Sequence, residues 1–196
     1  MKTMTYKLVL ASASPRRHEI LDLAGLPHCI RVSHADESSV SYRVGEPEAY
    51  VMALAKLKGS VVPPAEGEVV LSADTVVYIP ATGEVLGKPK DHDDAVRMFH
   101  LMSGTTHKVI TGVCLTDWTG AEKTFAETTE VTFRTLTEAE IEEYIETAQP
   151  YDKAGAYGIQ GGASLFVEKI VGDYYNVVGL PVCHLYTVLR EFMEDL

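Results

Sequence analysis

The chain has 196 residues, of which 46% are hydrophobic, and its 28 acidic and 17 basic residues give a formal net charge of −11. This composition suits a sizeable core rather than global disorder, and so acidic a chain is a poor candidate for binding a nucleic-acid polymer, which requires basic patches. No apolar run approaches the roughly 20 residues that span a bilayer, so we expect no membrane partner.

The length suits one domain, which we expect to cover residues 1–196. The start of the chain, Met1–Tyr6, has no signal-peptide pattern and leads into an apolar strand. The three cysteines are odd in number and far apart, which argues against a disulfide framework and fits a reducing compartment. We therefore expect a cytoplasmic protein.

The segment Leu8–Arg17 predicts a short apolar strand that turns into a helix beginning at Pro15, with Ser14 as its N-cap. Arg16 and Arg17 then lie in the first helical turn, where the partial positive charge of the helix N-terminus disfavours them. A bound anion would resolve this conflict, because helix N–H groups, serine hydroxyls and guanidinium groups together suit phosphate. A capped surface helix with solvated arginines is the alternative.

A second strand–helix pair follows. We expect a short strand at Cys29–Ser33, an acidic turn at Asp36–Glu37, and a helix that begins near Pro47 and ends before Gly59. Lys58 lies near the end of this helix, where a lysine is favourable through the helix dipole alone. It can therefore be structural or functional.

The stretch Val69–Ile79 has the continuous apolar run of a strand that is buried on both faces, but Asp74 interrupts it. Burying a carboxylate is costly unless it is paired or binds a metal, so Asp74 is a candidate functional residue. The alternative is a strand end or bulge at Ser72–Ala73 that lets the carboxylate reach water. Farther on, Lys88 lies between a glycine and a proline and is expected to be extended, either aimed at a site or solvated.

The other elements follow from periodicity and from cap and turn residues. We expect a strand at 84–86, a helix at 91–102, strands at 108–116 and 124–134, a helix from the capping box at 137–140 to about 147, a hairpin of strands at 165–170 and 174–178, and a last helix from 181 to about 194. These elements make an α/β protein with mixed sheets.

The stretch Asp152–Gly162 is rich in glycine, which allows a ligand to approach the backbone closely. Its spacing matches neither a P-loop nor a dinucleotide-binding fingerprint. Taken with the basic groups and the acidic candidates Glu37 and Asp74, it is consistent with a site for phosphate and a metal. Hard oxygen ligands favour Mg²⁺ or Mn²⁺, and the chemistry that follows is phosphoryl or nucleotidyl hydrolysis.

The chain resembles the Maf family of nucleoside triphosphate pyrophosphatases over essentially its whole length. The matching motifs, in order, are Leu10–Arg17, Leu54–Lys58, Ser72–Val77, Gly83–Pro89, Asp152–Gly161 and Val178–Pro181. The resemblance implies an elongated mixed-sheet α/β fold, related to that of the inosine triphosphatases, with a cleft between two lobes. It also implies cleavage between the α and β phosphates with a divalent metal, and a homodimer.

The resemblance also assigns roles by position. It implies that Asp74 is the catalytic carboxylate and that Asp74 and Glu37 bind the metal. The implied substrate- and phosphate-binding residues are Ser12, Arg17, Glu37, Lys58 and Lys88, and the implied specificity residues are Arg16, Thr75 and Gln160. This combination resembles the branch that prefers dTTP and UTP, with modified pyrimidine nucleotides as further candidates. Gly59 departs from the family pattern, which usually has alanine there.

A second function comes from the family's association with inhibition of septum formation. The chain could be a nucleotide-binding regulator of cell division. Such a regulator would need the cationic residues, but it would not need Asp74 positioned as a base.

Overall fold

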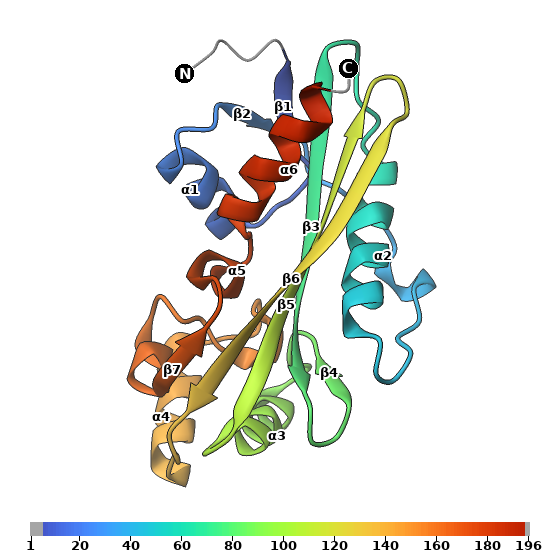
Figure 1. Ribbon diagram of the computed structural model, residues 1–196. Coiled ribbons are helices and arrows are strands. Elements are labelled where there is room, and N and C mark those ends of the chain that lie inside the picture. The colour runs from blue at the N-terminus through green and yellow to red at the C-terminus, as the bar shows by residue number, and fades with distance from the viewer. Residues whose placement is uncertain (1–5, 195–196) are drawn as a thin grey trace.

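The computed structural model describes residues 6–194 (Figure 1). Apart from Tyr6, the segment Met1–Tyr6 lies outside the described residues, and so do residues 195–196. Three long antiparallel strands run along the molecule, namely β3 (Glu68–Ile79), β5 (Thr106–Asp117) and β6 (Glu122–Phe133). They give the fold its elongated shape and connect its two ends.

Shorter strands extend this framework into one mixed sheet with the order β2-β1-β3-β5-β6-β7, in which β4 also pairs with β3. The pairs that β1 makes with β2 and with β3 are parallel, and the other pairs are antiparallel. The short strands are β1 (Lys7–Leu10), β2 (His28–Ile30), β4 (Glu84–Leu86) and β7 (Val167–Val171).

One edge of β3 is divided between two partners. Residues Glu68–Leu71 pair with β1, and Val77–Ile79 pair with β4. The opposite edge of β3 pairs with β5 continuously from Val69 to Tyr78. The sheet therefore forks in the middle of β3, and the residues between the two paired segments, 72–76, lie at the fork.

Helices cover both faces of the sheet (Figure 1). α1 (Pro15–Leu23), α5 (Tyr174–Val178) and α6 (Val182–Glu194) lie on one side of the long strands, and α2 (Pro47–Ser60) lies on the other. α3 (His92–Met102) and α4 (Glu138–Ala148) lie together at the end of the molecule that holds β4 and β7. No helix within residues 6–194 is long and apolar enough to cross a membrane.

α2 approaches the sheet so closely that its backbone touches β5. A Cβ atom added to Gly112 would lie 2.4 Å from the carbonyl carbon and oxygen of Val51. Gly112 is the register partner of Asp74 on the neighbouring strand. The absence of a side chain at residue 112 therefore sets the spacing between α2 and the strand that carries Asp74.

The core at the α3–α4 end is aromatic. The ring of Phe99 lies 5.3 Å from that of Tyr144 and 6.0 Å from that of Phe166, and Phe133 lies 4.9 Å from Tyr157, all between ring centroids. The edge-to-face orientations are those that aromatic pairs prefer. We call these five residues the aromatic cluster.

The expected hairpin at 165–178 is wrong in its second half. Val167–Val171 is a strand, but its partner is β6, and Tyr174–Val178 is the helix α5. The Asp173 side chain accepts a hydrogen bond from the backbone N–H of Tyr175 at 2.8 Å, and Gly179 ends the helix with a φ of +130°. This N-cap and the terminal glycine outweigh the strand preference of the aromatic and β-branched residues between them.

Three smaller expectations also need correction. α2 does not end before Gly59 but continues through it to Ser60. The strand expected at Cys29–Ser33 is shorter and lies at His28–Ile30. Ser14 occupies the N-cap position of α1, but its side chain makes no capping hydrogen bond. The capping box of Thr137 and Glu140 forms as expected.

Candidate active site

A cleft of about 910 Å³ opens at the fork of the sheet. Its walls come from the start of α1, α2 and the loop before it, the middle of β3, the segment after β4, the glycine-rich segment and the end of α5. All nine residues that the sequence assigns to the site line this cleft: Ser12, Arg16, Arg17, Glu37, Lys58, Asp74, Thr75, Lys88 and Gln160. Their roles remain predictions, but their gathering around one cavity is a structural fact.

Asp74 lies inside β3, within the unpaired stretch of its edge, and only 8% of the residue is exposed. No strand end interrupts β3 at Ser72–Ala73, because the strand continues to Ile79. Lys58 of α2 donates a 2.5 Å hydrogen bond to Oδ1 of Asp74 and also pairs with Oε1 of Glu37 at 3.1 Å. One ammonium group therefore compensates the buried carboxylate and draws the exposed Glu37 toward it.

Two carboxylates that converge on one cation provide the oxygen ligands that Mg²⁺ and Mn²⁺ prefer. The donor set of Asp74 and Glu37 therefore fits the divalent metal that the resemblance implies. Tyr50 also lines the cleft and is affected by the negative charges of the same two carboxylates. Burial, followed by the charges of Asp74 and Glu37, raises the pKa of its hydroxyl.

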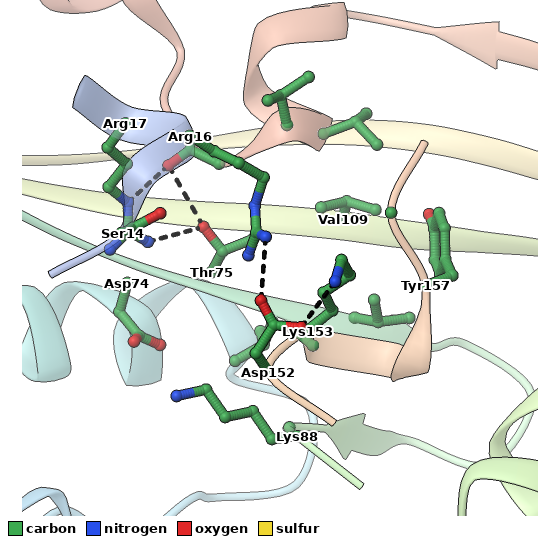
Figure 2. A pocket seen from close by; sticks show the side chains of 18 of the residues that line it. Ser14, Arg16, Arg17, Asp74, Thr75, Lys88, Val109, Asp152, Lys153 and Tyr157 are labelled. Carbon is green, nitrogen blue, oxygen red and sulfur yellow. Dashed lines mark hydrogen bonds and ion pairs between the residues drawn. The ribbon is translucent and has the colours of Figure 1, made fainter. Parts of the chain in front are cut away.

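The two neighbouring arginines of α1 have different environments (Figure 2). Arg17 is buried and donates three hydrogen bonds, to the carbonyl of Gly179 at 2.8 Å, to Oγ of Ser12 at 3.2 Å and to Oγ1 of Thr75 at 3.1 Å. Burial lowers the pKa of its guanidinium, the charge of Asp74 opposes this effect, and arginine stays charged at neutral pH. Arg17 thus joins α1, β3 and the end of α5.

Arg16 reaches across the cleft to the glycine-rich segment. Its Nη1 donates to Oδ2 of Asp152 at 3.2 Å, and Lys153 donates to the other oxygen of the same carboxylate at 2.6 Å. Partial burial raises the pKa of Asp152, but the hydrogen bonds from Lys153 and Arg16 outweigh burial and lower it. The sequence predicts that a bound anion offsets the unfavourable position of Arg16 at the helix N-terminus. In the structure, the carboxylate of Asp152 supplies part of that negative charge.

The N-terminus of α1 remains suited to an anion. The Ser14 side chain does not cap the helix, and Ala13, Ser14 and Pro15 all line the cleft. Oγ of Ser12 accepts hydrogen bonds from Arg17 and from the backbone N–H of Ser14, so its own proton remains available to a ligand. Helix N–H groups, a hydroxyl donor and a buried guanidinium thus face the same space.

Lys88 and Gln160 are exposed residues of the cleft wall. Figure 2 shows the Lys88 ammonium on the side of the cleft toward which the Asp74 carboxylate points. Both side chains can therefore meet a ligand without first breaking a buried contact.

Sequence reasoning missed two charged residues of this cleft, Asp152 and Lys153, although it singled out the segment that contains them. The signal was the position of two charged residues directly before a run of glycines. Tyr157 was also missed: its buried ring lines the cleft and its hydroxyl lies 2.9 Å from Nε2 of His107. No sequence pattern connects these two residues, which are 50 positions apart.

Comparison with known proteins places these observations in a family. The model of the family described as Maf-like protein matches residues 7–192. The "dTTP/UTP pyrophosphatase" of Bacillus cereus is 47% identical over 193 residues, covering 97% of both chains, and that of Bacillus cytotoxicus is 50% identical over 189 residues, covering 95% of both. That of Bacillus pumilus is 49% identical over 187 residues, covering 95% of this chain and 96% of its own.

A solved structure of a HAM1 protein from Coxiella burnetii shares the fold, with a TM-score of 0.52 and 14% sequence identity over 95% of this chain and 99% of its own. The fold expected from the sequence, a mixed α/β sheet with a cleft between two lobes, is confirmed. The match over residues 7–192 and the relatives at 47–50% identity confirm the resemblance, and this chain belongs to the Maf family.

Proposed function

We propose that this chain hydrolyses dTTP and UTP between the α and β phosphates, giving the nucleoside monophosphate and pyrophosphate. One observation carries the proposal: a carboxylate, Asp74, lies buried beside a cationic cleft and is bonded to Lys58. The identity of 47–50% to proteins named dTTP/UTP pyrophosphatase supports the choice of nucleotide. Modified pyrimidine nucleotides with the same base edge are further candidate substrates.

In the proposed reaction Asp74 accepts a proton from a water molecule, and the oxygen of that water attacks the α-phosphorus. The bond from that phosphorus to the bridging oxygen breaks, and pyrophosphate leaves with the electron pair. Lys58 holds Oδ1 of Asp74, which orients the second carboxylate oxygen for the water. Positioning of this kind supplies a large part of catalysis in phosphoryl-type transfers.

The phosphates would bind at the N-terminus of α1, where Ser12 offers a hydroxyl proton and Arg17 a fixed positive charge. Lys88 would contact the outer phosphates, because it is an exposed residue of the cleft wall and its ammonium lies on the side toward which the Asp74 carboxylate points. Asp74 and Glu37 would hold the divalent metal, Mg²⁺ or Mn²⁺, which when bound neutralises phosphate charge.

The base would lie toward Arg16, Thr75 and Gln160, which we propose as the specificity residues. Thr75 is already fixed by contacts with Arg17 at 3.1 Å and Thr111 at 2.9 Å, so it shapes the wall. Arg16 and Gln160 offer donors and an acceptor that suit the O4, N3–H and O2 edge common to uracil and thymine.

Incubation of the purified chain with UTP and MnCl₂, followed by chromatography of the products, tests the proposal. We expect UMP and pyrophosphate in equal amounts, with no UDP or free phosphate. Saturable UTP binding without turnover would overturn the hydrolase and favour the nucleotide-binding regulator of cell division. Sedimentation of the same sample measures whether the chain forms the homodimer that the family resemblance implies.

A further inference from the structure

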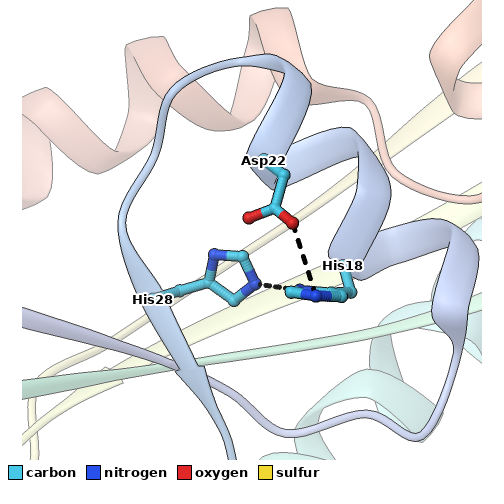
Figure 3. A group of neighbouring side chains, drawn as sticks. All are labelled: His18, Asp22 and His28. Carbon is cyan, nitrogen blue, oxygen red and sulfur yellow. Dashed lines mark hydrogen bonds and ion pairs between the residues drawn. The ribbon is translucent and has the colours of Figure 1, made fainter.

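A cluster of metal-ligating side chains lies outside the cleft. His18 and Asp22 of α1 and His28 of β2 each offer one ligand atom, and these atoms all lie within 4.8 Å of one another (Figure 3). None of the three lines the active-site cleft. The cluster is therefore a feature that the proposed hydrolysis does not use.

The local structure brings these side chains together for a simple reason. His18 and Asp22 are four residues apart on α1 and so share one helix face, and His18 pairs with Asp22 at 3.3 Å. The turn after α1 returns the chain to β2, whose first residue is His28. The two imidazole rings then meet edge to face, with Nδ1 of His18 2.7 Å from Nε2 of His28.

The hydrogen bonds fix the tautomer of His28. Its Nδ1 lies 2.8 Å from the carbonyl oxygen of Leu26, which can only accept, so Nδ1 carries the proton. Nε2 therefore has a lone pair directed at His18, and His18 supplies the proton between the two rings. An imidazole whose far nitrogen donates to a backbone carbonyl is the usual form of a metal-ligating histidine.

We propose that His18 and His28 bind a transition-metal cation of the Zn²⁺ or Ni²⁺ class, which replaces the proton between the two imidazoles, while Asp22 accepts a hydrogen bond from Nε2 on the other side of the His18 ring. Two imidazole nitrogens favour these metals over Mg²⁺, which prefers oxygen ligands. A carboxylate on the far nitrogen orients a metal-ligating histidine. The side chains of His18 and Asp22 are 43% and 61% exposed, so a metal ion can enter and keep water in its remaining positions.

The adjustment that the metal requires is small. Two nitrogens bound tetrahedrally to zinc at 2.0–2.1 Å lie about 3.3 Å apart, so the rings must separate by roughly 0.6 Å. Side-chain rotation can supply this shift because both rings are only half buried. The bound metal would tie α1, which begins with Arg16 and Arg17, to β2, which leads toward Glu37.

Isothermal titration of the whole chain, after treatment with EDTA and dialysis, tests this site. The titrations use ZnCl₂ and NiCl₂ in excess MgCl₂, which saturates oxygen ligands in the cleft, and a Cys29→Ser background, which removes the neighbouring thiol. We expect one equivalent of metal to bind, with affinity at least about tenfold lower in His28→Ala. The melting temperature of the Cys29→Ser parent should rise by about 5 °C at metal concentrations 100-fold above Kd.

His92→Ala is the matched control. His92 also pairs with a carboxylate, Glu142 at 2.8 Å, but among the described residues it belongs to no group of three potential metal ligands. This variant should bind the metal as tightly as the parent. If His28→Ala does not fold, His18→Gln on the exposed helix face gives the same test. Equal affinities in the parent and the histidine variants, or no binding of either metal, would overturn the proposal. Neither result depends on hydrolase activity.

Discussion

The cleft around Asp74 and the aromatic cluster around Phe133 both rest on the long strands β3, β5 and β6, but they accommodate buried polar groups differently. In the cleft, the buried carboxylate of Asp74 is compensated by an opposite charge, because Lys58 forms ion pairs with Asp74 and Glu37. Beside the aromatic cluster, His107 is fully buried, its Nε2 shares one hydrogen bond with the hydroxyl of Tyr157, and its Nδ1 has no partner among the described residues. Burial lowers the pKa of His107 to about 3, so it is neutral at neutral pH.

This difference teaches which polar groups are available for chemistry. In the cleft, the acidic side chains are paired with Lys58 and border a cavity. Beside the aromatic cluster, His107 is neutral and contributes to packing. Tyr157 belongs to both regions, because its ring packs on Phe133 and also lines the cleft. The following substitutions test whether the two regions behave as the comparison requires.

Asp74→Asn should have the largest effect. The amide cannot accept the proton from water, so turnover of UTP should fall at least roughly 100-fold, the usual scale for a lost general base. The fold and UTP binding should persist, as measured by melting temperature and by calorimetric titration. Asp93→Asn, an exposed substitution on α3, is the control and should keep full activity. Near-normal turnover in a folded Asp74→Asn protein would remove Asp74 from the mechanism.

Arg17→Ala should destabilise the fold by about 2–3 kcal/mol, because it leaves the buried carbonyl of Gly179 without its donor, removes one donor each from Ser12 and Thr75, and empties a buried position. Arg16→Ala should cost under about 1 kcal/mol, since its ion pair with Asp152 is exposed. Urea denaturation of both variants measures the difference. Similar losses in the two variants would mean that Arg17 does not hold the walls together.

The stability of the fold should fall in mild acid because of His107. The unfolded histidine binds a proton below about pH 6.5, whereas the folded one does so only near pH 3, so stability is complete above pH 6.5 and is lost as the pH falls toward 3. The loss at pH 5 should be about 2 kcal/mol. His107→Gln should show a decline between pH 7 and pH 5 that is smaller by this amount, and the exposed His100→Gln should match the parent.

Lys88→Ala should weaken the reaction by about tenfold, the scale of one lost charge-assisted contact, with almost no change in melting temperature. Lys88 is exposed, so removing it breaks no buried contact. Lys90→Ala, two residues farther on and also exposed, serves as the control. A large drop in the melting temperature of Lys88→Ala with normal kinetics would assign the residue a structural role.

The smallest effect should be the difference between UTP and dTTP. The two bases share the same hydrogen-bonding edge and differ by a methyl group, which a pocket separates by about 1–3 kcal/mol at most. CTP should react more weakly, because cytosine exchanges a donor and an acceptor on that edge. Arg16→Trp should erode the preference for uracil and thymine. A panel of nucleotides measures both, and equal turnover of CTP and UTP would show that Arg16 and Gln160 do not read the base.

The sequence predicts well where one local pattern is sufficient. The apolar run at 69–79 predicts the strand β3 that carries Asp74, and the capping box at Thr137 fixes the start of α4. It fails at Tyr174–Val178, where strand-forming residues are held in a helix by the cap at Asp173.

Contacts between distant segments could not be read from the sequence. Arg16 and Arg17 look equivalent there, but the burial of Arg17 depends on Gly179, 162 positions away. The fork in β3 depends on which strand pairs with each half of its edge, and the cluster of His18 and His28 depends on the turn between α1 and β2. Pairings of this kind arise only when the whole sheet is assembled.

The backbone contact at Gly112 makes the cleft sensitive to a residue that carries no functional group. Even a methyl group there would wedge α2 away from β5, and Lys58 would retreat from Asp74 with it. In a screen for loss of hydrolysis, Gly112→Ala would score like a substitution of a reacting residue, although every reacting residue would still be present. A crystal structure of that variant would reveal the displaced helix. We therefore expect residue 112 to tolerate no side chain in an active protein, although it takes no part in the reaction.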